Sequence, residues 1–491
     1  GCSCDWSRNA FTMDKNLSAS VIKVFIDLYN KGLIYKGKRL VNWDPKLGTA
    51  LSDLEVNQIE KVGKMWFIKY QLENSKENIV IGTTRPETIF GDSGIAIHPK
   101  NNKLNHLIGK KALIPILNKS IPIFADEYAD PEKGSGAVKI TPAHDFNDFE
   151  IGKKHDLEFV SIMDEKANLN KNTPNEYQGL NRFVARRKLI SELAKDNKIL
   201  KIVDNKMVFP VGDRSDEIIE PMLTFQWFLD TKKISIKVKE AIKEKKIVFH
   251  PSSWMNTFNY WIENIEPWCI SRQIWWGHRI PIWYSNNGLK IAAKSEEEAI
   301  DILKLKDETD KILYQDEDVL DTWFSSALWP FSTLGWPEND KLLKNFYPSN
   351  VLVTGFDIIF FWVARMVMMG LEFMNEVPFK NIYIHPLVKD EKGQKMSKSK
   401  GNVIDPLDLI EKYGSDALRF TLTNLSTQGR DIKLSDKLVE NSRNFITKIW
   451  NVARFSQFNN FKYDKKFYPQ YCELPVNNWI LSRFFETQNK V

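Results

Sequence analysis

The sequence predicts an α/β protein in which a parallel sheet is interrupted by a β-rich insert and followed by the start of an α-helical domain. Three patterns support this prediction. Helix and strand signals alternate between residues 211 and 434, as in parallel sheets that bind nucleotides at the carboxyl ends of their strands. Short β-branched runs replace this pattern between residues 61 and 210, and helical periodicity dominates after Asp431.

Residues 1–60 form the first part of the sheet domain and contain one amphipathic helix. Apolar residues recur at helical spacing between Ser18 and Tyr35, and Gly32 ends the pattern. The following segment, residues 40–50, is rich in turn-forming residues. We therefore expect a helix and then a turn-rich segment.

Residues 61–210 form the insert. Its expected strands, where β-branched residues recur with alternation, cover residues 65–72, 79–84, 95–98, 111–124 and 136–141. Two helices are expected, at residues 145–155 and 182–197. The insert should close near Pro210, because residues 212–215 read Gly-Asp-Arg-Ser and resemble a linker turn.

Residues 211–434 return to the alternating pattern. The expected elements are a helix at 232–245, a short buried strand at 351–353, a helix at 358–372 and a strand at 381–384. The last strand leads into a lysine-rich loop, residues 389–401. Residues 435–491 then begin the helical domain.

Bulk composition excludes several classes of protein. A chain of 491 residues is too long for one core and should form two to four domains. The 69 basic and 63 acidic side chains nearly balance, so overall charge does not indicate nucleic-acid binding, although local patches could. The four cysteines form no Cys-x-x-Cys pair, which favours a reducing compartment over a disulfide or zinc framework.

Membrane insertion is not expected. The most apolar segment, residues 358–370, is interrupted by Arg365 and is too short to span a bilayer, and no secretory leader precedes it. We expect a cytoplasmic protein that works as a monomer.

The lysine-rich loop is the most informative segment. It carries five lysines, with glycines near its margins: Lys389, Lys392, Lys395, Lys398, Lys400, Gly393 and Gly401. Charge alone favours a solvated surface loop, whereas movable ammonium groups on a glycine-flanked backbone also suit phosphoryl charge. Residues 395–399 read Lys-Met-Ser-Lys-Ser and residues 401–406 read Gly-Asn-Val-Ile-Asp-Pro. Both runs resemble the second signature of class I aminoacyl-tRNA synthetases.

This resemblance implies a Rossmann-type parallel sheet and a nucleotide site. ATP with Mg²⁺ would be the substrate complex, with no structural metal. Lys398, with Lys395 beside it, would stabilise the negative charge that grows on the phosphoryl oxygens and the departing pyrophosphate. Gly355 and Asp357 lie in a Gly-x-Asp run that would contact the adenosine, although Asp357 alone reads equally well as a helix cap.

Two longer motifs resemble the valyl-tRNA synthetases more closely than their isoleucyl and leucyl relatives. Residues 270–281 contain a Trp-Trp-Gly-His run, and residues 319–330 contain Asp-Thr-Trp-Phe-Ser-Ser. The resemblance implies ligation of valine to tRNA(Val) through a valyl-adenylate. Trp276, Trp323 and Val319, one helical turn before Trp323, would form the walls of the valine pocket. Without the resemblance, the aromatic residues would be assigned to core packing.

The insert carries a second pair of motifs, at residues 82–88 and 134–148, which resemble the family's editing pocket. Asp148 would bind the α-amino group of a mischarged threonine, and Lys139, Thr141 and Asp145 would read its hydroxyl and orient water. Arg85 and Thr88 would hold the terminal adenosine and the ester, so the six predicted editing residues are Arg85, Thr88, Lys139, Thr141, Asp145 and Asp148. Surface turns with a capped helix, or a zinc site at residues 144–148, are the weaker interpretations.

One family element is missing from these residues. Class I synthetases carry a His-x-Gly-His element near their start, and no two of the seven histidines here have that spacing. The first methionine is Met13, so we expect an internal fragment that is competent for editing but deficient in adenylate formation. A non-catalytic tRNA-binding module derived from a synthetase is the alternative.

Overall fold

The computed structural model of the chain describes residues 3–306, 310–338, 341–396, 401–426, 431–468 and 471–491. The chain forms two compact units. One unit combines Gly1–Ser7, Val353–Phe356 and Ile384–Val491, and the other combines Arg8–Leu352 and Asp357–Tyr383. The second unit contains the β-rich insert.

The chain enters the larger unit through helix α1 (Lys15–Asn30), which confirms the predicted amphipathic helix. Its buried side chains, among them Val24, Phe25 and Leu28, pack on one face, and the Phe25 ring lies edge-on to Trp227 at 6.0 Å. The next elements belong to an antiparallel sheet of four strands, in the order β12 (Trp268–Cys269), β10 (Glu220–Leu229), β1 (Ile34–Asp44) and β2 (Thr49–Leu51).

The turn predicted within residues 40–50 is present, but the strands on both sides of it were not predicted. Strands β1 and β2 occupy most of this segment, joined by a tight turn in which Gly48 has a φ of 67°. The turn residues were correctly recognised, but β1 is held by β10, whose residues lie far away in the sequence: Leu40 pairs with Leu223 and Trp43 with Glu220. A local pattern cannot show such a partner.

The insert is a β-rich layer with helices beside it, and it has strands at each predicted position, with the predicted run 111–124 divided into two strands. The strands are β3 (Val56–Leu72), β4 (Asn78–Thr83), β5 (Gly94–Ile97), β6 (Lys111–Leu113), β7 (Ser120–Ala125), β8 (Ala137–Ile140) and β9 (Ile199–Gly212). Their order is β4-β3-β6-β7-β5-β8, with β9 paired to β3. Helices α2 (Phe146–Lys154) and α3 (Arg182–Lys195) match the two predicted helices.

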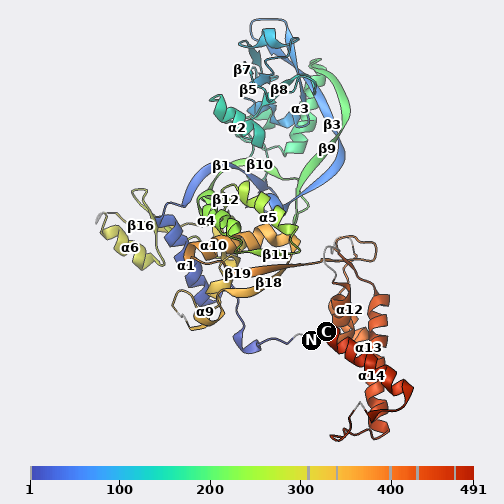
Figure 1. The fold of residues 1–491 in the computed structure, drawn as a ribbon. Coiled ribbons are helices and arrows are strands. Elements are labelled where there is room, and N and C mark those ends of the chain that lie inside the picture. Colours follow the sequence, from blue (N-terminus) through green and yellow to red (C-terminus); the bar gives the residue numbers. More distant parts are fainter. Residues whose placement is uncertain (1–2, 307–309, 339–340, 397–400, 427–430, 469–470) are drawn as a thin grey trace. The chain divides into compact units, whose positions relative to one another are not determined.

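Strand β3 is longer than the sequence pattern indicates, and β9 was not predicted. They pair antiparallel from Val56–Gly212 to Ile68–Ile199 and run side by side as a two-stranded ribbon (Figure 1). The hydrophobic core of the insert lies beyond this ribbon and includes the fully buried Ile68, Tyr70 and Ile95.

Short 3₁₀ turns lie before or between helices and strands in the first 180 residues. They are Trp6–Arg8, Asp53–Glu55, Pro86–Gly91, Asn105–Leu107 and Asn175–Tyr177.

The parallel sheet of the α/β part is small among the described residues. Strand β11 (Val248–His250) pairs parallel with β19 (Phe379–His385), which also neighbours β18 (Ser349–Gly355). The prediction of a strand at 351–353 was right, but the prediction that it is buried was wrong. Val351 is 53% exposed and Val353 is 58% exposed, because β18 lies at the edge of its sheet.

Helices pack around these strands. They are α4 (Thr231–Lys243), α5 (Trp254–Glu263), α7 (Thr322–Ser326), α8 (Trp329–Ser332), α9 (Lys341–Phe346) and α10 (Arg365–Phe373). The helix predicted at 358–372 is divided into a 3₁₀ turn at Phe356–Ile358, a π-helical segment at Ile359–Ala364 and then α10. Among the helices that the structure describes, none is both long and apolar enough to cross a membrane.

Two smaller strand groups complete the larger unit. Strands β14 (Ile282–Ser285), β15 (Lys290–Ala292) and β16 (Ile312–Gln315) form a sheet beside α6 (Glu296–Lys304). Strand β13 (Ser271–Arg272) pairs antiparallel with β17 (Val319–Leu320).

The smaller unit is mainly helical, with α11 (Pro406–Tyr413), α12 (Ser415–Leu425), α13 (Asp436–Phe458) and α14 (Pro475–Lys490). Its helices confirm most of the helical prediction after Asp431. The exception is β21 (Ile432–Lys433), which pairs parallel with β20 (Val388–Lys389) and was missed because its partner lies outside the helical segment.

Ile95 tests the core of the insert. Ile95→Ala should lower the free energy of unfolding by about 2–5 kcal/mol, because the fully buried side chain leaves a cavity. Ile202→Ala, the same substitution at a 47% exposed position of β9, should change it by less than about 1 kcal/mol. Denaturant unfolding followed by circular dichroism measures both. Equal losses would show that Ile95 is not part of a packed core.

Candidate functional site

Three of the predicted editing residues come together in the insert around the ammonium group of Lys139. This side chain extends from β8, and its Nζ lies 2.9 Å from Thr88 Oγ1 and 2.8 Å from Asp92 Oδ1. It also donates to Thr141 Oγ1. Thr88 comes from the 3₁₀ turn at 86–91, so residues about fifty positions apart in the sequence share one polar cluster.

Asp92 is the hub of this cluster, and the sequence interpretation missed it. Its carboxylate is fully buried and accepts hydrogen bonds from Lys139, from Thr141 Oγ1 at 2.7 Å and from Tyr70 OH at 2.7 Å. Burial raises the pKa of Asp92, while the Lys139 ammonium and the three hydrogen bonds oppose that rise. One signal in the sequence was available, because Asp92 is a lone charge within the apolar run of residues 89–97.

The start of helix α2 supplies the two remaining carboxylates. Asp145 caps the helix by accepting from the backbone N–H groups of Asn147 at 2.9 Å and Asp148 at 3.1 Å. Asp148 Oδ2 accepts from the backbone N–H of Thr141 at 2.8 Å, which ties the helix to β8. Burial raises the pKa of Asp148 to about 7, and the charge of Asp145 contributes to the rise. Asp148 is therefore a carboxyl group that can change protonation near neutral pH.

Arg85 is already bound by protein groups. Its guanidinium donates to the His144 carbonyl at 2.9 Å and to the Glu220 carboxylate, and its Nε lies 3.6 Å from Glu87. Glu87 is fully buried as a side chain and also accepts two 2.6 Å hydrogen bonds from Arg186. The sequence interpretation assigned Arg85 to the substrate but did not find Glu220, which binds Arg85, or Arg186, which binds Glu87.

The His144 ring is hydrogen-bonded to the backbone of the insert. Its Nε2 accepts the backbone N–H of Ile162 at 3.0 Å, and burial lowers the pKa of the imidazole to about 3, so the ring is neutral. No group of three or more His, Cys, Asp or Glu side chains is arranged to hold a metal ion in the parts of the chain that the structure describes.

A cleft of about 510 Å³ is lined by two of the predicted editing residues, Arg85 and Asp145. Its walls include the aromatic rings of Trp66, Phe183 and Phe209. Aromatic walls with cations nearby suit the bases and phosphates of a single-stranded nucleotide.

The predicted valine-pocket residues lie on different elements. Val319 is in strand β17, whereas Trp323 is in helix α7, so the prediction that one helical turn separates them was wrong. The Val319 side chain packs against Gly277, where an added Cβ would lie 2.9 Å from Val319 Cγ2. Trp275 and Trp276 immediately precede this glycine. The contact between Val319 and Gly277 therefore also brings the Trp-Trp-Gly-His run close to β17.

The two tryptophans have different neighbours. The Trp323 ring stacks on Phe361, with centroids 5.1 Å apart. Trp276 is 56% exposed and lies edge-on to Trp275 at 5.7 Å.

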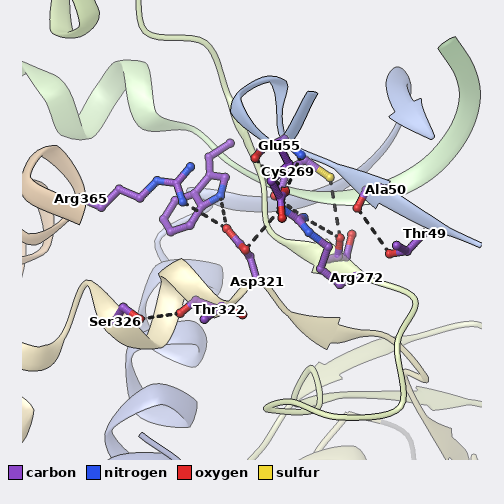
Figure 2. A network of polar contacts seen from close by, with 12 residues as sticks. Thr49, Ala50, Glu55, Cys269, Arg272, Asp321, Thr322, Ser326 and Arg365 are labelled. Carbon is purple, nitrogen blue, oxygen red and sulfur yellow. Dashed lines mark hydrogen bonds and ion pairs between the residues drawn. The ribbon is translucent and has the colours of Figure 1, made fainter. Parts of the chain in front are cut away.

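A buried charge network sets the start of helix α7. Asp321 accepts from Arg365 Nη1 at 3.1 Å and from Trp268 Nε1 at 3.0 Å, and Arg272 Nη2 lies 3.4 Å from its other oxygen. Figure 2 shows Arg365 and Arg272 directed at Asp321 from opposite sides. Since Trp323 follows two residues later, this network positions it.

The predicted nucleotide residues are divided between the two units, because Gly355 and Lys395 belong to the smaller unit and Asp357 belongs to the larger one. Gly355 is the last residue of β18, and Asp357 lies in the following 3₁₀ turn. Lys395 is exposed, and its carbonyl accepts from Asn402 Nδ2 at 3.3 Å. Lys398 lies outside the described residues. Lys389 forms an ion pair with Asp431 at 2.6 Å, so it anchors the loop to β21.

Comparison with known proteins identifies the family. A family model described as tRNA synthetases class I (I, L, M and V) matches residues 1–435. The chain belongs to this family. Its class I synthetase fold, a Rossmann-type domain with a β-rich insert, agrees with the fold class predicted from the sequence.

Three similar relatives carry the name Valine--tRNA ligase. The relative from Pelagibacter ubique (strain HTCC1062) is 56% identical over 492 residues, covering 100% of this chain and 56% of the relative. Those from Nitrobacter winogradskyi and Caulobacter vibrioides are 49% and 51% identical, with the same coverage of both chains. This class I synthetase chain thus spans little more than half the length of the curated relatives it matches.

A solved structure is also similar. The ternary complex of Agrobacterium radiobacter K84 LeuRS with tRNA and LeuAMS matches 96% of this chain and 64% of that chain, with 19% identity and a TM-score of 0.47.

Asp148 of this synthetase chain should titrate near neutral pH. Its carboxyl signal, followed by ¹³C NMR against pH, should have a midpoint near pH 7. Asp145→Asn should lower that midpoint, because it removes the neighbouring negative charge while an asparagine can still cap helix α2. Asp196→Asn, at an exposed position after α3, should leave it unchanged. A midpoint near the ordinary aspartate value of about 3.9 would contradict the prediction.

Proposed function

We propose that this chain is part of a cytoplasmic valine–tRNA ligase that also edits mischarged tRNA. The ligation reaction would join valine to tRNA(Val) through a valyl-adenylate at the expense of ATP bound with Mg²⁺. The editing reaction would hydrolyse threonyl-tRNA(Val). The names of relatives that are 49–56% identical support the first reaction. The buried cluster of Lys139, Thr141 and Asp148 is the observation that carries the second.

The chemistry of valine selection explains why a second site is needed. Threonine has nearly the same shape as valine, and an apolar pocket rejects its hydroxyl only weakly, a limit for which valine-specific synthetases are a standard example. A polar site discriminates in the opposite sense, because its buried groups stay unpaired when valine binds. The insert supplies such polar groups, whereas the proposed valine pocket is built from Trp276, Trp323 and Val319.

The editing residues have separable roles in this proposal. Asp148 would bind the α-ammonium of the mischarged residue, since its second oxygen is not used by the Thr141 backbone N–H. Asp145 would orient the water that attacks the ester carbonyl. The C–O bond to the terminal ribose then breaks, and a proton passes to the ribose oxygen. Arg85, already fixed by its protein partners, would border the terminal adenosine in the 510 Å³ cleft, and Thr88 would hold the ester.

The residues proposed for ligation would contact ATP. Gly355 and Asp357 would contact the adenosine, and Lys398 with Lys395 would meet the developing charge on the pyrophosphate. Residues 1–491 contain no His-x-Gly-His element, so adenylate formation by this polypeptide alone is proposed to be slow, while editing is proposed to be intact.

Threonyl-tRNA(Val) should be deacylated faster than valyl-tRNA(Val) by the 491-residue chain, because only threonine offers a side-chain hydroxyl to the polar cluster. Asp148→Ala should reduce the threonyl rate by about 100-fold or more, as expected for loss of a group that contacts the substrate. Asp196→Ala, at an exposed aspartate of the same insert, should have no effect. Release of labelled amino acid measures the rates. Equal rates for the two substrates would refute the editing function.

Lys398 should serve ligation alone. In a polypeptide that also carries a His-x-Gly-His element, Lys398→Ala should reduce ATP–pyrophosphate exchange by about 100-fold, because it removes charge stabilisation from the transition state. Deacylation of threonyl-tRNA(Val) should be unchanged. If both activities fell together, the assignment of the two reactions to separate sites would be wrong.

A further inference from the structure

The hydrogen bonds around Lys139 use every proton of its ammonium group. An ammonium has three N–H donors and no acceptor. Thr88 Oγ1, Asp92 Oδ1 and Thr141 Oγ1 each receive one of them. Lys139 is only 9% exposed, so it has no fourth direction in which to offer a proton. In this arrangement Lys139 cannot itself donate to a substrate hydroxyl, contrary to the direct role first assigned to it.

The two threonine hydroxyl protons are also committed. Thr88 Oγ1 donates to the Arg85 carbonyl at 2.9 Å. Thr141 Oγ1 lies 2.7 Å from Asp92 Oδ1, and an ionised carboxylate can only accept, so the proton points toward Asp92. Each hydroxyl also accepts from Lys139 and keeps one lone pair. The free hydrogen-bonding capacity of both hydroxyls is therefore that of an acceptor.

Asp92 determines that the threonine hydroxyls are left as acceptors, although it does not itself contact the substrate. It is 0% exposed, and its second oxygen is occupied by Tyr70 OH at 2.7 Å. Its first oxygen takes both the third proton of Lys139 and the proton of Thr141. Removing that oxygen would free two donors in the cluster.

We propose that Asp92 is a positioning residue that determines editing specificity, because it makes the threonine wall of the site accept hydrogen bonds rather than donate them. A threonyl side chain can donate its hydroxyl proton to this wall. A valyl methyl group cannot, and it would leave the Thr88 and Thr141 lone pairs unpaired. This inference rests on the proposed editing function and adds a residue to it.

The test compares ratios of kcat/KM for deacylation of threonyl-tRNA(Val) and valyl-tRNA(Val), which do not depend on how much of a preparation is folded. Asp92→Ala should reduce the ratio about ten-fold or more, because the Lys139 and Thr141 protons lose the acceptor that fixes their direction, so the polar wall can adapt to a valyl side chain as well as to a threonyl one. Asp92→Asn should keep most of the ratio, since an amide oxygen can accept in place of Oδ1 and its NH₂ can face Tyr70.

A matched control is Asp126→Ala. Asp126 is another buried aspartate of the insert, and it accepts from Lys154 and His155 at 2.7 Å. Its loss should leave the ratio unchanged. An unchanged ratio in Asp92→Ala, or an equal fall in Asp126→Ala, would overturn the proposal.

If Asp92→Ala does not fold, a substrate analogue tested on the unaltered chain decides whether the proposal holds. The tRNA(Val) ester of 2-amino-3-fluorobutanoic acid carries fluorine, which cannot donate, in place of the threonine hydroxyl. It should be hydrolysed at a rate close to that of the valyl ester. Hydrolysis as fast as that of the threonyl ester would overturn the role of Asp92 while leaving editing intact. Failure to prefer threonyl over valyl ester would remove both proposals.

Discussion

The shared carboxylate of Asp321 is the interaction on which the arrangement of the larger unit depends. Arg272 and Arg365 both direct a guanidinium at it, Trp268 donates to it, and Glu55 lies 3.4 Å from Arg272. These residues come from four separate stretches of sequence. The Arg365 guanidinium also lies 3.7 Å from the centre of the Trp268 ring, where the π-system offers further stabilisation.

Burying these charges costs free energy unless each stays paired, and this requirement holds the network to one arrangement. Burial lowers the pKa of Arg365 to about 10, although Asp321 opposes the shift. Such a network adds little stability compared with apolar packing, but losing one partner leaves another charge buried and unpaired. The chain is thereby held to one register, in which Glu55 marks the start of the insert ribbon and Asp321 precedes the helix of Trp323. The proposed valine wall and the ribbon that carries the insert share one anchor.

A second carboxylate shared by two guanidinium groups lies where the insert meets strand β10. Glu220 accepts from Arg85 and, at 2.8 Å, from Arg182, which is almost fully buried. Glu220 also pairs in register with Trp43 of β1, whose indole N–H donates to the Glu165 carbonyl of the insert. The guanidinium that borders the editing cluster is thus held by a strand of the body of the unit, and the orientation of Arg85 depends on residues that no editing motif contains.

Sequence reasoning found most of the strands of the insert and most of the helices, because their alternation and periodicity are local properties. It also selected Thr88, Lys139 and Thr141, which the fold brings into contact. It missed what depends on distant partners, namely the pairing of β1 with β10, the exposure of Val351, and the separation of Val319 from Trp323 by a change of element. Asp92 was missed for a related reason. A single buried charge gains meaning only when Lys139, Thr141 and Tyr70 are seen around it.

The contrast between the two proposed sites follows from what each must distinguish. An apolar wall excludes by size, so rigid aromatic rings suffice, and stacking such as that of Trp323 on Phe361 supplies the rigidity. A site that must recognise one hydroxyl needs polar groups whose protons cannot rotate, because a rotatable hydroxyl could adapt to either partner. Lys139 and Asp92 restrict the Thr88 and Thr141 hydroxyls in that way, within a cluster that is almost wholly withdrawn from water. Burial then makes an unmade hydrogen bond costly, and that cost is the physical basis of discrimination.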